Sequence, residues 1–261
     1  MMSLISEAGL ANRMRALDSA SMLAIATGHS LSVWWPRNQN CGAAFGDLFA
    51  PIPTVATDSP KALLIDRIVR LPFKGLALEG KLKARFYDPS NRPLDSALEE
   101  VRSQTFVAIR TEHPFFYPES FAWATPKAEI ASAIASTTAM LGSNSVGVHI
   151  RRGDHVTATR DNPTEAFVSA MQRRVSEHPE TVFFVASDDP ILKAQLRESF
   201  RAVTHEASNS RSDVKGVRAA VVDLFALANC SEIWGSRGSS FGEVAHHLRK
   251  APLIFPIART T

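Results

Sequence analysis

The densest group of reactive side chains in this sequence is the run VHIRRGD, from Val148 to Asp154. A short β-branched strand is expected to end at Ile150, which places four polar groups at or beyond its carboxyl end: His149, Arg151, Arg152 and Asp154. Ligands of open α/β sheets bind beyond the carboxyl ends of the strands. Two guanidinium groups with one acidic partner are suited to clamp a diphosphate, because each pairs bidentately with phosphate. A surface ion pair is the alternative, and the residue types alone favour neither.

An acidic pair follows the next expected strand, residues 182–186. Asp188 and Asp189 stand directly before Pro190, where a helix is expected to begin. These carboxylates are suited to hold a metal, to accept a hydrogen bond from a sugar, or to cap that helix. On spacing alone, capping is the favoured interpretation.

A turn rich in glycine and serine, residues 234–243, lies between an expected strand and an expected helix. It contains Ser239, Ser240 and Phe241, and it matches neither the dinucleotide fingerprint nor the Walker pattern. Backbone N–H groups and hydroxyls at a helix N-terminus bind anions. An ordinary N-cap with a flexible turn is the alternative.

A further turn joins the first expected strand to the first expected helix. Gly9 would let the backbone approach a ligand, and Asn12 and Arg13 would face that ligand. In isolation, a plain turn with a solvated arginine is the favoured interpretation.

The elements that must position these groups alternate regularly in the second half of the chain. Strands are expected at 146–150, 182–186, 202–204, 232–234 and 253–255, and helices at 164–177, 190–200, 213–228 and 240–249. Thr164 is the expected N-cap of the first of these helices. Such alternation predicts a parallel sheet covered by helices on both faces.

The first half begins in the same way and then becomes less regular. A strand at 4–5 leads to a long helix that ends at Thr27-Gly28-His29, and a strand follows at 31–35. Short apolar runs occur at 62–65 and 106–109 within a stretch interrupted by prolines. The segment 114–126, rich in proline and aromatic residues, is interpreted as the crossing between two lobes.

Composition restricts the class of protein further. With 45% apolar and 21% charged residues, the 261-residue chain is neither disordered, collagen-like nor a coiled coil. Its net charge of +3 suits a small anionic ligand better than a nucleic acid. The two cysteines are isolated and no export signal is found, which predicts a cytoplasmic protein. No apolar stretch is long enough for a membrane helix, so no membrane span is expected. His246-His247 lacks the spacing of a metal site, so no metal is assigned.

Taken together, the four segments resemble those of the fucosyltransferase superfamily, which includes the α1,6-fucosyltransferases, the nodulation fucosyltransferases, the α1,2-fucosyltransferases and the protein O-fucosyltransferases. The resemblance rests on HxRRxD, the acidic strand end and the serine-rich last turn, and it covers residues 146–248 better than residues 9–13. It implies a GT-B-type α/β fold, with two Rossmann-like lobes whose parallel sheets face a central cleft. The lobes would be residues 1–125, on the acceptor side, and residues 126–261, which bind the nucleotide-sugar.

The resemblance also implies roles for individual residues. Arg151 and Asp154 would be catalytic, with Arg151 pairing with the β-phosphate of the donor and supporting the leaving diphosphate. Asp223 would accept hydrogen bonds from the guanine edge, with a solvated helix face as the alternative. The other donor-binding residues would be His149, Arg152, Asp188, Asp189, Ser239, Ser240, Phe241, Gly9, Asn12 and Arg13.

We therefore expect a metal-independent, inverting glycosyltransferase that transfers fucose from GDP-fucose to a glycan or lipid-linked acceptor. GDP-fucose would be a substrate, and no cofactor, nucleic-acid partner or membrane span is expected; the oligomeric state is left open. The α1,6 enzymes carry a Glu five residues beyond the motif Asp, where this chain has Thr159, so the general base is unassigned among His155, Asp161 and Glu165. A different nucleotide-sugar donor, or a non-catalytic nucleotide- or glycan-binding module, are the alternatives.

Overall fold

The computed structural model describes residues 1–71, 75–117, 119–152, 161–205 and 210–257. The chain forms two compact units, one of residues Met1–Thr125 with Arg211–Val217, the other of residues Pro126–Ser210 with Arg218–Thr261. Residues 211–217 therefore group with the first unit, although the sequence places them in the second lobe.

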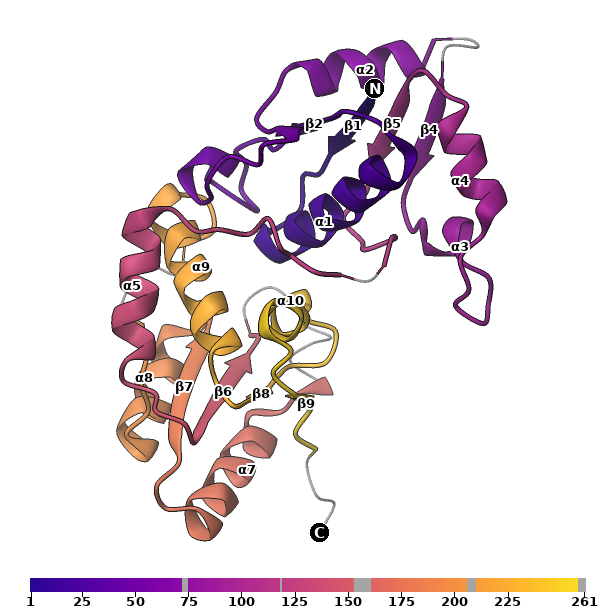
Figure 1. Ribbon diagram of the computed structural model, residues 1–261. Helices are drawn as coiled ribbons and strands as arrows, with labels where there is room; N and C mark the ends of the chain where they lie inside the picture. Colours follow the sequence, from indigo (N-terminus) through magenta and orange to yellow (C-terminus); the bar gives the residue numbers. More distant parts are fainter. Residues whose placement is uncertain (72–74, 118, 153–160, 206–209, 258–261) are drawn as a thin grey trace. The chain divides into compact units, whose positions relative to one another are not determined.

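The first unit is built on a parallel sheet in the order β3-β2-β1-β5-β4 (Figure 1). Its strands are β1 (Met2–Ile5), β2 (Leu31–Trp34), β3 (Val55–Ala56), β4 (Leu76–Glu79) and β5 (Val107–Arg110). In the register, Ile5 pairs with Arg110, which also pairs with Glu79. The carboxyl ends of β1, β5 and β4 therefore lie level at one edge of the sheet.

Helices cover this sheet, namely α1 (Leu10–Thr27), α2 (Lys61–Val69), α3 (Lys83–Phe86) and α4 (Asp95–Arg102), with a short 3-10 turn η1 (Phe45–Asp47). The contacts of α2 are with the strands, whereas α1 contacts both α4 and the strands. As expected, α1 ends at a glycine, Gly28, whose φ of 72° is accessible to glycine at little cost. The apolar runs at 62–65 and 106–109 lie in α2 and at β5.

The second unit contains a parallel sheet in the order β7-β6-β8-β9. Its strands are β6 (Ser145–Ile150), β7 (Val182–Ser187), β8 (Glu232–Trp234) and β9 (Leu253–Ile254). Its helices are α5 (Ala128–Thr138), α7 (Thr164–Glu177), α8 (Pro190–Phe200), α10 (Ser240–Arg249) and, from Arg218 onwards, α9 (Val214–Ala228). The predicted alternation of strands and helices is confirmed, and so is the α/β class with two parallel sheets.

Three details of the second unit differ from the sequence-based expectations. The strand expected at 202–204 is reduced to a single parallel bridge between Val203 and Phe184, because only one residue pair meets. Thr164 is the first helical residue of α7, and Pro163 occupies the N-cap position. Helix α5 was not predicted, since its alanine-rich, weakly amphipathic sequence carries little periodic signal.

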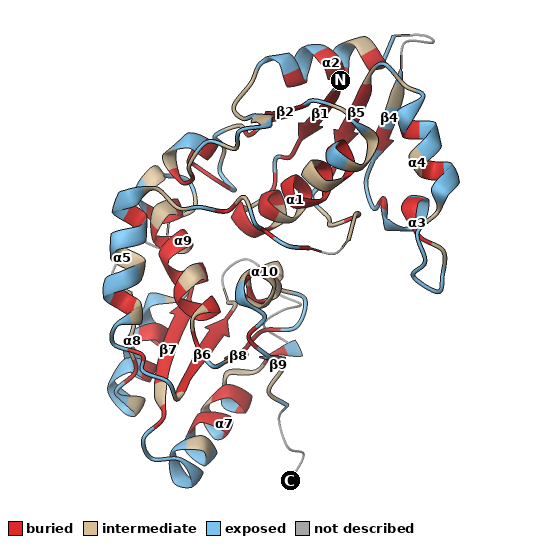
Figure 2. Ribbon diagram, viewed as in Figure 1, coloured by how far each residue is buried: buried red, intermediate tan, exposed pale blue. Residues whose placement is uncertain are grey.

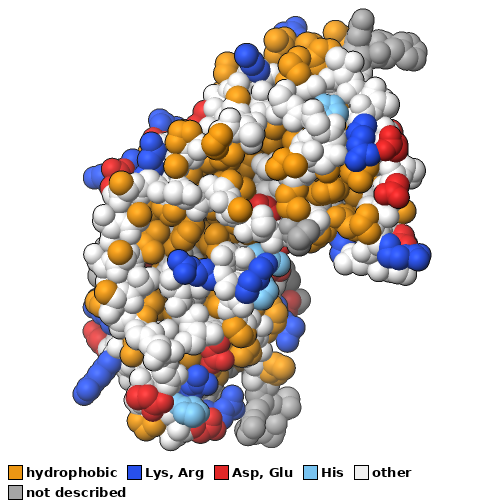
Figure 3. All heavy atoms as spheres, viewed as in Figure 1, with side chains coloured by type: hydrophobic (Ala, Val, Ile, Leu, Met, Phe, Trp, Pro, Cys, Tyr) orange, Lys and Arg blue, Asp and Glu red, His pale blue; other side chains and the backbone are white. Residues whose placement is uncertain are grey.

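Strands β1, β5, β6 and β7 are largely buried (Figure 2), whereas most residues of β3, β4 and β9 are half-buried or exposed. Every residue of β6 is buried, and Phe167 and Phe183 lie with it in the hydrophobic core of the second unit. On the face drawn in Figure 3, basic side chains are interspersed with acidic and hydrophobic ones. Within the described ranges, no helix is both long and apolar enough to cross a membrane.

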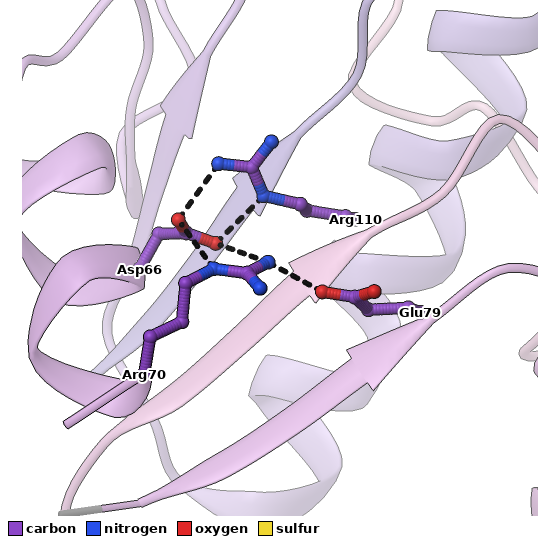
Figure 4. A network of polar contacts seen from close by, with 4 residues as sticks. All are labelled: Asp66, Arg70, Glu79 and Arg110. Atoms are coloured by element: carbon purple, nitrogen blue, oxygen red, sulfur yellow. Dashed lines mark hydrogen bonds and ion pairs between the residues drawn. The ribbon is translucent and has the colours of Figure 1, made fainter.

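A polar network ties α2 to the carboxyl edge of the first sheet (Figure 4). Arg110 donates from Nε and Nη2 to the two carboxylate oxygens of Asp66, at 2.9 and 2.7 Å, and Arg70 donates to the same carboxylate. Arg70 also pairs with Glu79. The hydrogen bond from Arg110 is the main cause that lowers the pKa of Asp66 below its ordinary value, although burial opposes it.

We expect Asp66→Asn to destabilise the protein by about 1–2 kcal/mol near neutral pH, because it removes the charge on which both arginines converge at a partly solvated edge. Since the folded pKa is lowered, this stabilisation is present above the ordinary aspartate pKa of about 3.9 and is lost as the pH falls through the folded value. Urea unfolding of the wild type and the variant between neutral and acidic pH measures it. A difference that does not shrink towards acidic pH would contradict the prediction.

Candidate functional site

The polar segments singled out in the second half of the sequence meet at one edge of its sheet. Ile150 of β6 pairs with Ser187 of β7, and Val148 of β6 pairs with Trp234 of β8. The three strands are neighbours and run in parallel, so the chain leaves all three at the same, carboxyl, edge. This is the edge at which open α/β sheets bind ligands.

The carboxylate of Asp188 connects the two arginines of the HxRRxD segment. Its Oδ2 forms an ion pair with the guanidinium of Arg151, and its Oδ1 accepts a hydrogen bond of 2.7 Å from the backbone N–H of Arg152. The side chains of Arg151 and Asp188 are each only 18% exposed, which shields the pair from water and strengthens it. Asp188 therefore orients the segment that follows β6.

The guanidinium of Arg152 is oriented by the start of α7. Its Nη2 and Nε donate to Thr164 Oγ1 at 2.6 and 3.1 Å, and its Nη1 donates to the carbonyl of Arg151 at 2.8 Å. Burial lowers the pKa of Arg152, while the neighbouring Asp188 opposes this shift. The hydroxyl of Thr164, which the sequence suggested as a helix cap, serves instead as the acceptor for this arginine.

Two buried serines fix the strand ends. Ser236 Oγ accepts a hydrogen bond of 3.0 Å from the backbone N–H of Arg151 and lies 3.3 Å from the carbonyl of His149, to which it donates. Ser187 Oγ donates to the carbonyl of Ile150 at 2.8 Å. Sequence reasoning did not select Ser236, although it lies in the quoted glycine- and serine-rich turn; its partners, some 85 residues away, are visible only in the folded chain.

His149 is buried and stacks on Phe241, with ring centroids 4.9 Å apart and an interplanar angle of 26°. Burial, assisted by the charge of Arg151, lowers the pKa of His149 to about 3, so the imidazole is neutral at physiological pH. Its Nδ1 has no hydrogen-bond partner among the residues that the structure describes. The stacking brings together two of the predicted donor-binding residues.

The side chain of Asp189 caps α8. Its Oδ1 accepts hydrogen bonds from the backbone N–H groups of Ile191 and Leu192, at 2.9 and 3.1 Å. Of the two adjacent aspartates, Asp189 therefore follows the capping interpretation, whereas Asp188 pairs with the side chain of Arg151.

Ser239 and Ser240 stand at the N-terminus of α10, Ser239 at the N-cap position and Ser240 as the first helical residue. Gly238 before them has a φ of 76°, a conformation that glycine adopts without strain. The turn is held at its other side by Asn162, whose amide oxygen accepts from the N–H of Arg237 at 2.6 Å. The predicted serine-rich turn thus connects β8 to the N-terminus of α10, and the hydrogen bond to Asn162 holds it in place.

Asp223 lies inside the second unit and is only 8% exposed, so the interpretation of a solvated helix face is wrong. Its Oδ2 is 3.9 Å from Lys193 Nζ, and its Oδ1 is 3.8 Å from His205 Nδ1. Burial raises the pKa of Asp223 to about 7, although the positive charge of Lys193 opposes the shift. Val203 bridges Phe184 of β7, so His205, two residues further along, lies level with the carboxyl end of that strand.

The residues of the N-terminal turn belong to the first unit. Arg13 is completely buried, so the interpretation as a solvated arginine is wrong. Its Nε and Nη1 donate to the carbonyls of Ala8 and Pro36, and its guanidinium lies 5.4 Å from the ring centroid of Trp35. Gly9 is the N-cap of α1 with an ordinary φ of −69°, and Asn12 is half-buried in the first turn of that helix.

Some of the residues singled out in the sequence lie outside the part of the chain that the structure describes. Asp154, predicted to be catalytic, lies outside the described residues, and so do His155 and Thr159. Over the described ranges, no group of three or more His, Cys, Asp or Glu side chains is arranged to hold a metal ion.

Comparison with known proteins gives matches among solved structures only. No family model matches the sequence, and no curated protein matches it. The structure resembles NodZ α-1,6-fucosyltransferase soaked with GDP-fucose, with a TM-score of 0.61 and 18% identity over 95% of this chain and 92% of that chain. It also resembles a mutant of Arabidopsis thaliana FUT1 in complex with GDP, with a TM-score of 0.64 and 14% identity over 97% of this chain and 69% of that chain.

A third similar structure is POFUT1 in complex with GDP, with a TM-score of 0.56 and 13% identity over 98% of both chains. All three likenesses extend over nearly the whole of this chain, so they include both of its sheets. Identities of this size carry information on the fold and not on individual residues. The chain therefore has the same α/β fold as these fucosyltransferase structures, as its sequence motifs led us to expect.

Proposed function

We propose that this protein is a metal-independent, inverting glycosyltransferase that transfers fucose from GDP-fucose to a glycan or lipid-linked acceptor. The observation that carries the proposal lies at the carboxyl edge of β6 and β7, where Asp188 pairs with the side chain of Arg151 and accepts a hydrogen bond from the backbone N–H of Arg152. This pairing occurs in a chain with a fucosyltransferase fold, and solved structures of that fold include ones soaked with GDP-fucose or in complex with GDP.

The arginines supply the chemistry that a leaving diphosphate needs. Negative charge grows on the diphosphate as the C1–O bond of the donor breaks, and preorganised cations at that place lower the barrier. In this proposal Arg151 keeps Asp188 on one edge of its guanidinium and turns another edge to the β-phosphate. The N-terminus of α10, with Ser239 and Ser240, adds backbone N–H groups and the positive end of the helix dipole.

A cationic clamp of this kind does the work that a divalent metal does in other transferases, and on this ground we propose catalysis without a metal. In the same proposal Asp154 assists Arg151 as the second catalytic residue, on the strength of the HxRRxD pattern.

The nucleoside part of the donor would be recognised by Asp223 and His149. A carboxylate accepts hydrogen bonds from the N1–H and the N2 amino group of guanine, and this pattern is not offered by uracil. The neutral His149, stacked on Phe241, has a buried ring nitrogen suited to a hydrogen bond with the nucleotide. In this proposal the second unit binds the nucleotide-sugar, and the first unit binds the acceptor.

The choice of donor is tested by thermal unfolding with GDP or UDP, each with EDTA present. A ligand that binds only the folded state raises the melting temperature, so we expect a clear increase with GDP and little or none with UDP. Equal shifts with both nucleotides would favour a different donor. A GDP shift that needs a divalent cation would contradict metal independence.

Replacing Arg151 tests the proposed clamp. We expect Arg151→Met to lower kcat for fucosyl transfer by about 100-fold or more, because stabilisation of the leaving group acts mainly in the transition state. Transfer from GDP-fucose is measured on a glycan panel, with donor hydrolysis followed in parallel.

Arg174→Met is the matched control for that variant, since Arg174 belongs to the same unit and pairs with Glu232, where β8 begins, at the opposite edge of the sheet. We expect near wild-type rates for this control. Undiminished transfer by Arg151→Met would contradict the proposed clamp. If the wild type shows no transfer and no donor hydrolysis, the protein is a binding module instead.

The ionisation of Asp223 gives a pH signature. Because its pKa is raised to about 7, the carboxylate becomes protonated as the pH falls below that value and stops accepting from guanine. We expect the affinity for GDP to fall by about tenfold for each pH unit well below 7 in the wild type, relative to Asp223→Asn at the same pH.

Calorimetry gives the ratio of the GDP affinity of the wild type to that of Asp223→Asn at each pH. The titration of the GDP phosphates affects both proteins equally and therefore cancels in this ratio. Lys193 and His205 face the same carboxylate and remain in both proteins, so they do not create the difference. A ratio that stays constant with pH would show that Asp223 does not bind the base.

A further inference from the structure

The first unit has an open hollow of about 400 Å³ at the carboxyl edge of its own sheet. Its lining includes Glu7, Asn40, Arg110, Glu112 and His113. Arg110 ends β5 and lies in register with the ends of β1 and β4, so the hollow occupies the position where parallel sheets bind ligands.

Hydrogen bonds between side chains and the backbone hold the lining of this hollow. Thr111, which is buried, donates from Oγ1 to the carbonyl of Gly80 at 2.7 Å and accepts from the N–H of His113 at 3.1 Å. On the other side, Asn38 donates to the carbonyl of Glu7 at 2.8 Å and accepts from the N–H of Asn40 at 2.9 Å. Contacts of this kind hold the lining in place before a ligand arrives, which lowers the entropy cost of binding.

The guanidinium of Arg110 is oriented within this lining. It is held against Asp66 through Nε and Nη2, so Nη1 lies on the side away from that carboxylate (Figure 4). Arg70 holds Asp66 from a second direction. Arg110 is therefore a hydrogen-bond donor of the lining that is held in place, and its charge is balanced within the network that Asp66 and Glu79 form with the two arginines.

The remaining charged groups of the lining are the carboxylates of Glu7 and Glu112, both on exposed residues. An anionic ligand would meet two carboxylates and an arginine that is already neutralised, which costs electrostatic energy. A sugar hydroxyl, in contrast, donates to a carboxylate and accepts from a guanidinium or an amide, so an uncharged polyol can pair with both the carboxylates and the N–H donors of the lining.

We infer that this hollow is the acceptor site, that it takes an uncharged sugar, and that Arg110 and Glu112 hydrogen-bond to the hydroxyls of that sugar. Asp66 acts as a positioning residue for Arg110. This inference rests on the proposed function, since it names the acceptor class of the same enzyme as uncharged glycans rather than anionic, lipid-linked ones.

The test is binding of the full chain, without donor, to an array of immobilised uncharged, amine-bearing and acidic glycans. We expect binding to uncharged glycans, weakened about tenfold or more in Arg110→Met and in Glu112→Gln, because each variant removes a hydrogen bond to a charged group. Glu112 is exposed, so its replacement keeps the test valid if Arg110→Met unfolds.

Arg85→Met is the matched control, because Arg85 is a similarly exposed arginine of the same unit that pairs with one carboxylate, Glu100, and does not line the hollow. It is expected to bind glycans as the wild type does. In parallel, stabilisation by GDP is measured for every variant and is expected to persist, which reports on the proposed function independently of the hollow.

Preference for acidic glycans, binding to no glycan, or equal binding by Arg110→Met, Glu112→Gln and the wild type would overturn the inference. If GDP still stabilises the protein in any of these cases, the proposed donor chemistry stands and only the hollow is refuted. If glycan binding depends on Arg110 while GDP has no effect, the hollow is supported and the proposed transferase function is refuted.

Discussion

The geometry of the second unit depends on one fully buried strand, β6, between two parallel neighbours. A strand buried on both faces has no freedom in register, because a shift by one residue would exchange its core contacts. Gly147 in its middle shows how close the packing is: a Cβ there would come within 2.9 Å of Leu227 on α9. With β6 fixed, the chain can leave the sheet only at one point, and Arg151 and Arg152 emerge there, directly after the strand that holds the buried His149.

Once the strand end is fixed, a single carboxylate organises the charges. Asp188 pairs with the side chain of Arg151 and accepts a hydrogen bond from the backbone N–H of Arg152. The side chains of Arg151 and Asp188 are both mostly buried there. The arginines of such a cluster are oriented before any ligand binds, so little side-chain entropy is lost on binding. The chain's modest net charge of +3 thus matters less than the local placement of two cations.

The first unit follows the same topological principle with different chemistry at the sheet edge. There the arginine, Arg110, is paired in a bidentate manner with Asp66, and further carboxylates surround the hollow. One edge therefore has the groups that suit a diphosphate, and the other has the mixed donors and acceptors that suit hydroxyl groups. This difference in charge is the physical basis for proposing a donor site in one unit and an acceptor site in the other.

The sequence by itself determined the α/β class, the order of the elements in the second half, and the strand ends at which polar residues cluster. These features follow from local periodicity and from turn residues, and helices such as α8 and α10 begin and end at the expected residues. The local spacing already favoured Asp189 as a helix cap, but tertiary structure alone decided that Asp188 pairs with Arg151 and that Arg13 and Asp223 are buried among distant segments. The reason is that such partners come from segments tens of residues apart, and they meet only through the order and register of strands that no local pattern encodes.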